Sequence, residues 1–247
     1  MEIRERDKSP ISNFQFPTKI IGKTIKGTVP NFQCFIRVHL WLNSYITTMI
    51  KLIIFDLGNV ILNFDHNIIC RKLSQISRFS PQQVYEIIFT SGLERLYDEG
   101  KISTRDFFKK VSNRLKLNIS LTGFKQIWQD IFWLNEGIEE ILLSLRGRYK
   151  LFLLSNTNEI HFEFAMAKFD VLNFIDEYIL SYQVGFSKPA KEIFYEALKR
   201  ANVEAEKCIY IDDIKEHIAS ASKIGMNGIL FQSISQLKMD LWSALSG

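Results

Sequence analysis

The chain has 247 residues, 47% of them hydrophobic, which is enough apolar material for a sizeable core and excludes a wholly disordered protein. Its formal net charge of +4 comes from residues 1–48, which hold seven Lys or Arg and three Asp or Glu, whereas residues 49–247 carry 24 of each. That neutral remainder has no basic stripe, so we expect no nucleic-acid partner.

The cysteines and the hydropathy pattern indicate the compartment. Cys34, Cys70 and Cys208 are widely separated and form no metal-binding spacing, which favours free thiols in a reducing environment. The sequence contains no run of about 18 apolar residues and no signal-peptide pattern. We therefore expect a cytoplasmic protein with no membrane partner, and the sequence leaves its oligomeric state open.

Residues 1–48 mix charges, Pro, Gly and isolated aromatic residues without a sustained period. Two interpretations carry equal weight. In one, this segment is a poorly ordered extension or a leader that precedes the native start at Met49. In the other, it is an extra element that packs on the core through the apolar residues between Phe35 and Trp41.

The first regular elements are a strand and a group of helices. Leu52–Phe55 is a continuous apolar run that ends at Asp56, as a strand buried on both faces should. The segments QQVYEIIF, TRDFFKKVSNRLKL and FKQIWQDIF then repeat apolar residues at three- and four-residue spacing, which predicts helices. We expect Ser80 and Ser103 to cap two of them, with Pro81 at the first helical position.

These helices form a predicted all-α insertion over residues 67–136. Its aromatic residues lie at helical spacing and are expected to pack as its core, or at its seam with the rest of the protein, rather than to stack on a ligand: Phe107, Phe108, Trp128, Phe132 and Trp133.

Beyond Gly137, helical and strand patterns alternate. The apolar runs YKLFLLS, EYILS, KCIYIDD and NGILF read as strands, and GIEEILLSLRG, KEIFYEALKRA and KEHIASASKIG read as helices. Strands too apolar to have a wet face indicate a parallel sheet between helices. We predict an α/β fold, a Rossmann-like doubly wound core over residues 49–66 and 137–247 that carries the inserted helices.

Polar residues follow these strands at the edge where ligands of open α/β sheets gather. They are Asp56, Ser155, Asn156, Thr157, Asp212 and Asp213, with Lys188 in the loop GFSKP. Each alone has an ordinary structural interpretation as a turn residue, a helix cap or a solvated lysine. Together, carboxylates, a hydroxyl, an amide and a lysine at one sheet edge predict binding of Mg²⁺ and a phosphoryl group.

The segments FDLGNVI, LLSNTN, GFSKPAKEIF and YIDDIKEHIASASKIGM resemble, in order, the four motifs of the haloacid dehalogenase-like hydrolases. The likeness covers residues 49 to 233 and is greatest to bacterial phosphatases of the α-glucose 1-phosphate type. It implies a small phosphorylated metabolite, in particular a sugar phosphate, as substrate. It also implies that residues 67–136 are a helical cap domain that closes over the site.

The resemblance assigns roles to individual residues. Asp56 would attack phosphorus and form an aspartyl-phosphate, and Lys188 would neutralise the phosphoryl charge and orient Asp56. Ser155 and Asn156 would hold the phosphoryl oxygens. The magnesium ligands would be Asp56, the carbonyl of Gly58 and Asp213, with Asp212 as a supporting carboxylate.

Gly58 departs from the family pattern, because most phosphatases of the family carry there a second Asp that protonates the leaving oxygen. A positioned proton donor contributes roughly 10² to 10⁴ in rate. Asp65, Glu94 or a water held by the cap are alternatives for this role, and a good leaving group such as an anomeric hydroxyl would reduce the need for it.

Other polar residues receive a more ordinary interpretation. His66, Asn67, Glu94 and Arg95 are read as surface or packing residues before substrate contacts. His161 could face the site, whereas His217 is expected on a helix surface.

Two competing functions remain at this point. A dehalogenase would use Asp56 against carbon without a metal, and the pair Asp212 and Asp213 argues against it. A phosphate-binding regulatory protein would have lost turnover at Gly58, yet it would have no reason to keep the nucleophile Asp56.

Overall fold

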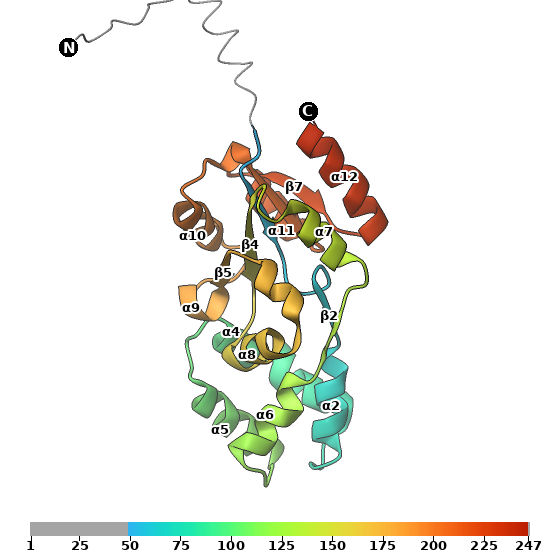
Figure 1. Cartoon of the computed structure of the whole chain (residues 1–247). Helices are drawn as coiled ribbons and strands as arrows, with labels where there is room; N and C mark the ends of the chain where they lie inside the picture. Colours follow the sequence, from blue (N-terminus) through green and yellow to red (C-terminus); the bar gives the residue numbers. More distant parts are fainter. Residues whose placement is uncertain (1–48, 247) are drawn as a thin grey trace, which may run out of the picture. The chain divides into compact units, whose positions relative to one another are not determined.

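The computed structural model describes residues 49–246, so the interpretations of residues 1–48, Cys34 included, fall outside it. At its centre is a parallel five-stranded sheet with the order β5-β4-β1-β6-β7 (Figure 1). The strands are β1 (Leu52–Phe55), β4 (Lys150–Ser155), β5 (Glu177–Leu180), β6 (Cys208–Asp212) and β7 (Asn227–Leu230). Each matches a predicted apolar run, and the predicted doubly wound α/β fold is confirmed.

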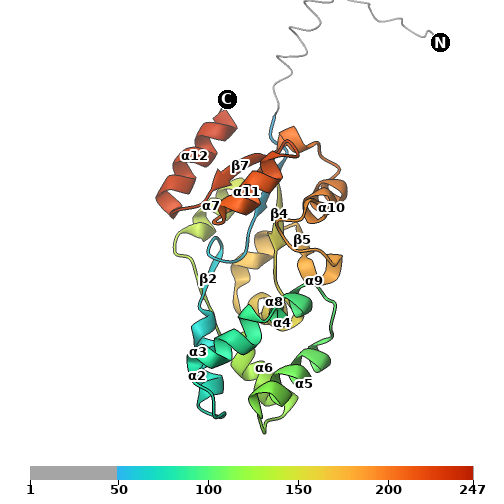
Figure 2. The same ribbon diagram turned by 180° about the vertical axis from the view of Figure 1, so that it is seen from behind.

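Helices cover both faces of this sheet. Successive side chains of a strand point to opposite faces, so one strand contributes to the apolar packing on each side. Ile53 and Phe55 pack in the apolar cluster shared with α7 and α12, and Leu52 and Ile54 pack in the one shared with α10 and α11. Figure 1 looks onto the side of α7, and Figure 2 looks onto the side of α11. The helices are α7 (Ile138–Leu145), α8 (Glu159–Lys168), α10 (Lys191–Ala201), α11 (Lys215–Ser222) and α12 (Ile234–Ser246).

A group of helices follows β1 in the chain and lies beyond the carboxyl ends of the strands (Figures 1 and 2). They are α2 (His66–Ser74), α3 (Pro81–Tyr85), η1 (Glu86–Thr90), α4 (Leu93–Asp98), α5 (Thr104–Leu115) and α6 (Leu121–Gln129). Ser80 and Ser103 accept hydrogen bonds from backbone N–H groups three residues on, with Pro81 in the first turn, which confirms the predicted caps.

The remaining short elements are η2 (Asp170–Phe174), α9 (Ser181–Val184) and η3 (Ala205–Lys207). Within residues 49–246 no helix combines the length and the apolar character that a membrane span requires.

Two short strands carry the chain between the sheet and these helices. β2 (Leu62–Phe64) and β3 (Phe132–Leu134) pair antiparallel, with Phe64 opposite Phe132. The expectation that Phe132 continues the helix of FKQIWQDIF is therefore wrong: α6 ends at Gln129, because the following residues are needed as the partner strand of β2.

The core of the inserted helices is aromatic, as predicted. Phe107 and Trp128 are fully buried, with ring centroids 4.8 Å apart. The expected packing of Trp133 is wrong: this residue lies on strand β3 and is 49% exposed. Trp128 also stacks on His161 of α8 at 5.4 Å, so the aromatic cluster extends to a helix of the sheet layer.

Candidate active site

The polar residues expected at the strand ends meet at one edge of the sheet. Asp56 directly follows the central strand β1, and its N–H donates to the carbonyl of Ile211 on β6 at 2.9 Å. Ser155 ends β4 and Asp212 ends β6, the two strands that flank β1. Parallel register thus brings three chain-distant side chains to one place.

Lys188 connects the two carboxylates. Its Nζ lies 2.7 Å from Asp56 Oδ1, 2.8 Å from Asp212 Oδ2 and 3.1 Å from the carbonyl oxygen of Leu154, so all three ammonium protons have an acceptor. The residue is 4% exposed. Burial alone would lower the pKa of Lys188, but Asp56 and Asp212 outweigh it and hold that pKa above its ordinary value. The lysine therefore stays charged.

Asp56 is a buried carboxyl group with few ways to keep its charge. Burial raises its pKa to about 8, against the opposing effect of Lys188. The backbone N–H of Leu57 donates to Oδ1 at 2.7 Å. To act as the nucleophile that the family motif implies, Asp56 would have to be ionised, which a further positive charge close to it would favour.

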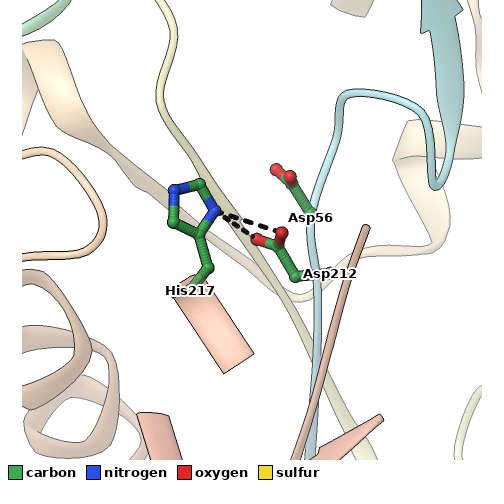
Figure 3. Close-up of side chains that lie close together, drawn as sticks. All are labelled: Asp56, Asp212 and His217. Carbon is green, nitrogen blue, oxygen red and sulfur yellow. Dashed lines mark hydrogen bonds and ion pairs between the residues drawn. The ribbon is translucent and has the colours of Figure 1, made fainter. Parts of the chain in front are cut away.

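Asp212 has both carboxylate oxygens engaged. Besides Lys188, it accepts hydrogen bonds from the Tyr210 hydroxyl and from the N–H of Ile214. His217 Nδ1 lies 3.0 Å from Oδ2 and 3.1 Å from Oδ1 (Figure 3). Although burial opposes it, Lys188 and His217 hold the pKa of Asp212 well below its usual range. As a buried carboxylate that stays ionised, Asp212 holds Lys188 and His217 in position.

The expected surface position of His217 is wrong. The residue is 7% exposed and reaches from α11 toward Asp212 and Asp56 (Figure 3). The first turn of α11 follows β6 so closely that its inward side faces the strand end. A hydrophobic period does not reveal this, because most of the residues on α11 are small or polar.

Asp213 is less occupied than Asp212. Asn59 Nδ2 donates to its Oδ2 at 2.9 Å, and Asn59 has a φ of 56°, a left-handed conformation that aims its short amide across the loop. This leaves acceptor capacity on the Asp213 carboxylate. The carbonyl of Gly58, the third donor implied by the family motif, belongs to a residue that lines the adjacent cavity.

This donor set fits Mg²⁺. Asp56, Asp212 and His217 offer atoms within 4.8 Å of one another, but the His217 ring nitrogen that faces the group is committed to Asp212. The groups left for a metal are carboxylate and carbonyl oxygens, the hard ligands that magnesium takes alongside water and phosphate. A cation here would also favour the ionised form of Asp56.

Asn156 makes a reciprocal pair with the backbone of Lys188. Its Nδ2 donates to the Lys188 carbonyl at 3.0 Å, and its Oδ1 accepts from the Lys188 N–H at 2.7 Å. The side chain therefore fixes the lysine loop. Because both polar atoms of this side chain are in use, the predicted contact of Asn156 with phosphoryl oxygens would have to be made by its backbone. Ser155, 3% exposed, lines the cavity beside it.

A cavity of about 210 Å³ opens beside these residues. Its lining combines the strand-end loops with the inserted helices: Leu57, Gly58, Phe64, His66, Glu94, Asp98, Phe132, Ser155, Asn156, Thr157 and His161. Asp98 was missed by the sequence reasoning, although its place four residues after Glu94 on one helix face is a signal that could have found it.

The polar residues of the inserted helices divide into two groups. His66 and Glu94 line the cavity, with His66 Nε2 3.5 Å from Glu94 Oε1. Asn67 instead hydrogen-bonds the N-cap Asp65, and Arg95 pairs with Glu99 at 2.9 Å. His161 faces the cavity as expected, and burial lowers its pKa to about 3, which keeps the ring neutral.

Comparisons with known proteins agree with this geometry. A family model described as haloacid dehalogenase-like hydrolase matches residues 53–231. D-ribitol-5-phosphate phosphatase from Bacteroides thetaiotaomicron is 28% identical over 186 residues, which cover 72% of this chain and 89% of that protein.

Two solved structures share the fold. A HAD family enzyme from Bacteroides thetaiotaomicron, in complex with magnesium and inorganic phosphate, has a TM-score of 0.68 and 24% identity, covering 74% of this chain and 95% of its own. A predicted HAD-like family hydrolase from Porphyromonas gingivalis has a TM-score of 0.71 and 24% identity, covering 81% of this chain and 99% of its own.

Proposed function

The chain belongs to the haloacid dehalogenase-like hydrolase family, as its motifs predicted, and on this premise we propose that it is a magnesium-dependent phosphohydrolase of a small phosphorylated metabolite. In this proposal Asp56 attacks phosphorus and carries the phosphoryl group as an aspartyl-phosphate, which water then hydrolyses. Membership in a hydrolase family agrees with the prediction from the sequence that the protein is an enzyme of the phosphatase class.

The observation that carries the proposal is the bridge of Lys188 between Asp56 and Asp212. A phosphate dianion repels a carboxylate nucleophile. A lysine that offsets this repulsion must lie close to the phosphate and to Asp56. Lys188 is fixed by Asn156 and by the Leu154 carbonyl, so its charge needs no reorganisation during the reaction. Ser155, which lines the cavity beside Asp56, is assigned to the phosphoryl oxygens.

We assign the metal site to Asp56, the Gly58 carbonyl and Asp213, with Asp212 supporting it through Lys188. Bound Mg²⁺ would stabilise negative charge on the phosphoryl oxygens. The oxygen donors and the free capacity of Asp213 support this assignment.

For the substrate, we propose a sugar phosphate or a related polyol phosphate. The name of the relative, D-ribitol-5-phosphate phosphatase, supports this class. So does the cavity, because His66, Glu94 and Asp98 offer hydrogen-bonding groups to hydroxyls. In this proposal residues 67–136 are the cap domain that selects the substrate and excludes water.

The test is phosphate release from sugar phosphates, nucleotides and acyl phosphates, with and without Mg²⁺, for wild type and Asp56→Asn. We expect magnesium-dependent release that the substitution abolishes. A folded wild-type protein that binds a phosphate analogue but releases no phosphate would instead favour a binding protein, for which the missing carboxyl group at Gly58 is the motivating observation.

A further inference from the structure

Glu94 and Asp98 form a pair of carboxyl groups in the wall of the cavity that comes from the cap. They lie four residues apart on α4, so they share one face of the helix, and both line the cavity together with Gly58, Ser155 and Asn156. The roles assigned so far at the sheet edge use neither of them. They are also the carboxyl groups that this cavity has in place of one at Gly58.

The surroundings of the two groups differ. Asp98 is held in place: Asn158 Nδ2 donates to its Oδ1 at 2.9 Å, and Ser181 Oγ lies 2.5 Å from its backbone oxygen. Glu94 instead contacts the imidazole of His66 at 3.5 Å. The rings of His66 and Phe64 pack with their centroids 4.9 Å apart. The Phe64 ring in turn lies beside Gly58.

Resting on the proposed function, we propose that Glu94 is the proton donor that replaces the carboxyl group absent at Gly58, with Asp98 as a positioning residue behind it. In the first step the bond from Asp56 to phosphorus forms and the bond from phosphorus to the leaving oxygen breaks. The leaving oxygen takes the bonding electron pair and the proton of Glu94. In the second step water attacks phosphorus and gives its proton to Glu94, and the electron pair of the broken bond returns to Asp56.

The electrostatics agree with a protonated Glu94. Burial raises its pKa well above the ordinary value, and the charge of Asp98 raises it further. Burial also lowers the pKa of His66 to about 4, although Asp65 opposes this, so the imidazole is neutral and does not compete for the charged form. Glu94 also acts on Cys70, whose pKa is raised to about 11, mainly by burial. An uncharged acid beside a neutral ring is ready to donate.

The experiment measures kcat/KM for a series of aryl phosphates of increasing leaving-group pKa, and for a sugar phosphate, in wild type and Glu94→Gln. We expect a loss of about 10² to 10³ for the poor leaving groups and less than about tenfold for para-nitrophenyl phosphate, whose leaving group needs no proton. Aryl phosphates carry no hydroxyls, so a residue that only binds sugar would leave this series unchanged.

Two further variants sharpen the result. Asp65→Asn is the matched control, because Asp65 is a carboxylate at the N-terminus of α2 that does not line the cavity, and asparagine keeps a capping side chain. An equal loss for all leaving groups in Glu94→Gln, no loss at all, or a dependence on leaving-group pKa that appears in Asp98→Asn instead would each overturn the proposal.

A measurement without turnover separates this proposal from the proposed function. At pH 7 the infrared difference spectrum of wild type and Glu94→Gln should contain the carbonyl stretch of a protonated carboxylic acid. Its absence would overturn the role of Glu94 even where phosphate release is intact. If this stretch is present in a protein that releases no phosphate, Glu94 is protonated as inferred, but the proposed phosphatase function is wrong.

Discussion

Phe64 occupies the space that a side chain on residue 58 would need: a Cβ atom added to Gly58 would lie 2.7 Å from Phe64 Cε1. Restoring the family carboxyl group by Gly58→Asp is therefore expected to destabilise the fold by about 1–3 kcal/mol, because the ring must move. It should not raise activity. Urea unfolding and phosphate release test this, and the free-energy cost of Gly58→Asp should be smaller in a Phe64→Ala background than in the wild type. A single variant of unchanged stability would contradict the steric account.

Lys188→Met is expected to abolish activity and to destabilise the protein by about 3–5 kcal/mol, because it leaves buried carboxylates unpaired. The loss of stability should be larger at pH 9 than at pH 6, since Asp56, with a pKa of about 8, ionises beside Lys188 over this range in the wild type, whereas burial would keep it protonated in the variant. Urea unfolding at both values provides the measurement, with Lys191→Met, on the exposed start of α10, as the control. Equal losses at the two pH values would argue against the bridge.

Asn59→Gly is expected to weaken Mg²⁺ binding by about 10- to 100-fold, because it removes the amide that orients Asp213. Glycine accepts the φ of 56° at this position, so the backbone should keep its path. Titration calorimetry with Mg²⁺ measures the effect, and the thermal midpoint of the metal-free protein serves as the check on folding. An unchanged affinity would remove Asp213 from the proposed metal site.

Asp98→Asn is expected to change how stability depends on pH. Burial raises the pKa of Asp98 in the fold to about 7, from 3.8 for an ordinary aspartate, so the folded protein holds a proton that the unfolded chain releases. Wild-type stability should therefore fall by up to about 1.4 kcal/mol per pH unit between about pH 4 and pH 7, through this group alone. The variant lacks this fall.

The control for this prediction has the opposite sign. Hydrogen bonds from Asn67 lower the pKa of Asp65, so its contribution is present at neutral pH and disappears as the solution becomes acidic. Urea unfolding of wild type, Asp98→Asn and Asp65→Asn from about pH 2 to pH 8 compares them, because the contribution of Asp65 changes only below about pH 4. A stability difference between wild type and Asp98→Asn that stays constant over that range would contradict the raised pKa.

The sheet could be predicted from the sequence because a strand buried on both faces is a continuous apolar run with a sharp end. The polar residue after each run was thereby located as well, and Asp56, Ser155 and Asp212 do meet at one edge. The family and the enzyme class followed from the resemblance of four segments to the motifs of a known family, and both are confirmed. Individual roles at the site stay predictions.

What the sequence could not indicate depends on short elements and on packing. β2 and β3 have three residues each, too few for a period, and Phe132 therefore looked helical. His217 lies on a helix whose buried side is small and polar. The pairing of Asn156 with the backbone of Lys188 joins segments 32 residues apart, which no local pattern records.

The antiparallel pairing of β2 with β3 has an evolutionary consequence. The chain leaves the sheet layer at Phe64 and returns at Phe132, and these two residues are direct partners. Everything between them is attached at a single closed junction, so lengthening or replacing it costs the rest of the protein little loop-closure entropy. A lineage could exchange this whole insert, and with it the substrate selection proposed for it, while the register of the parallel sheet and the position of Asp56 stay as they are.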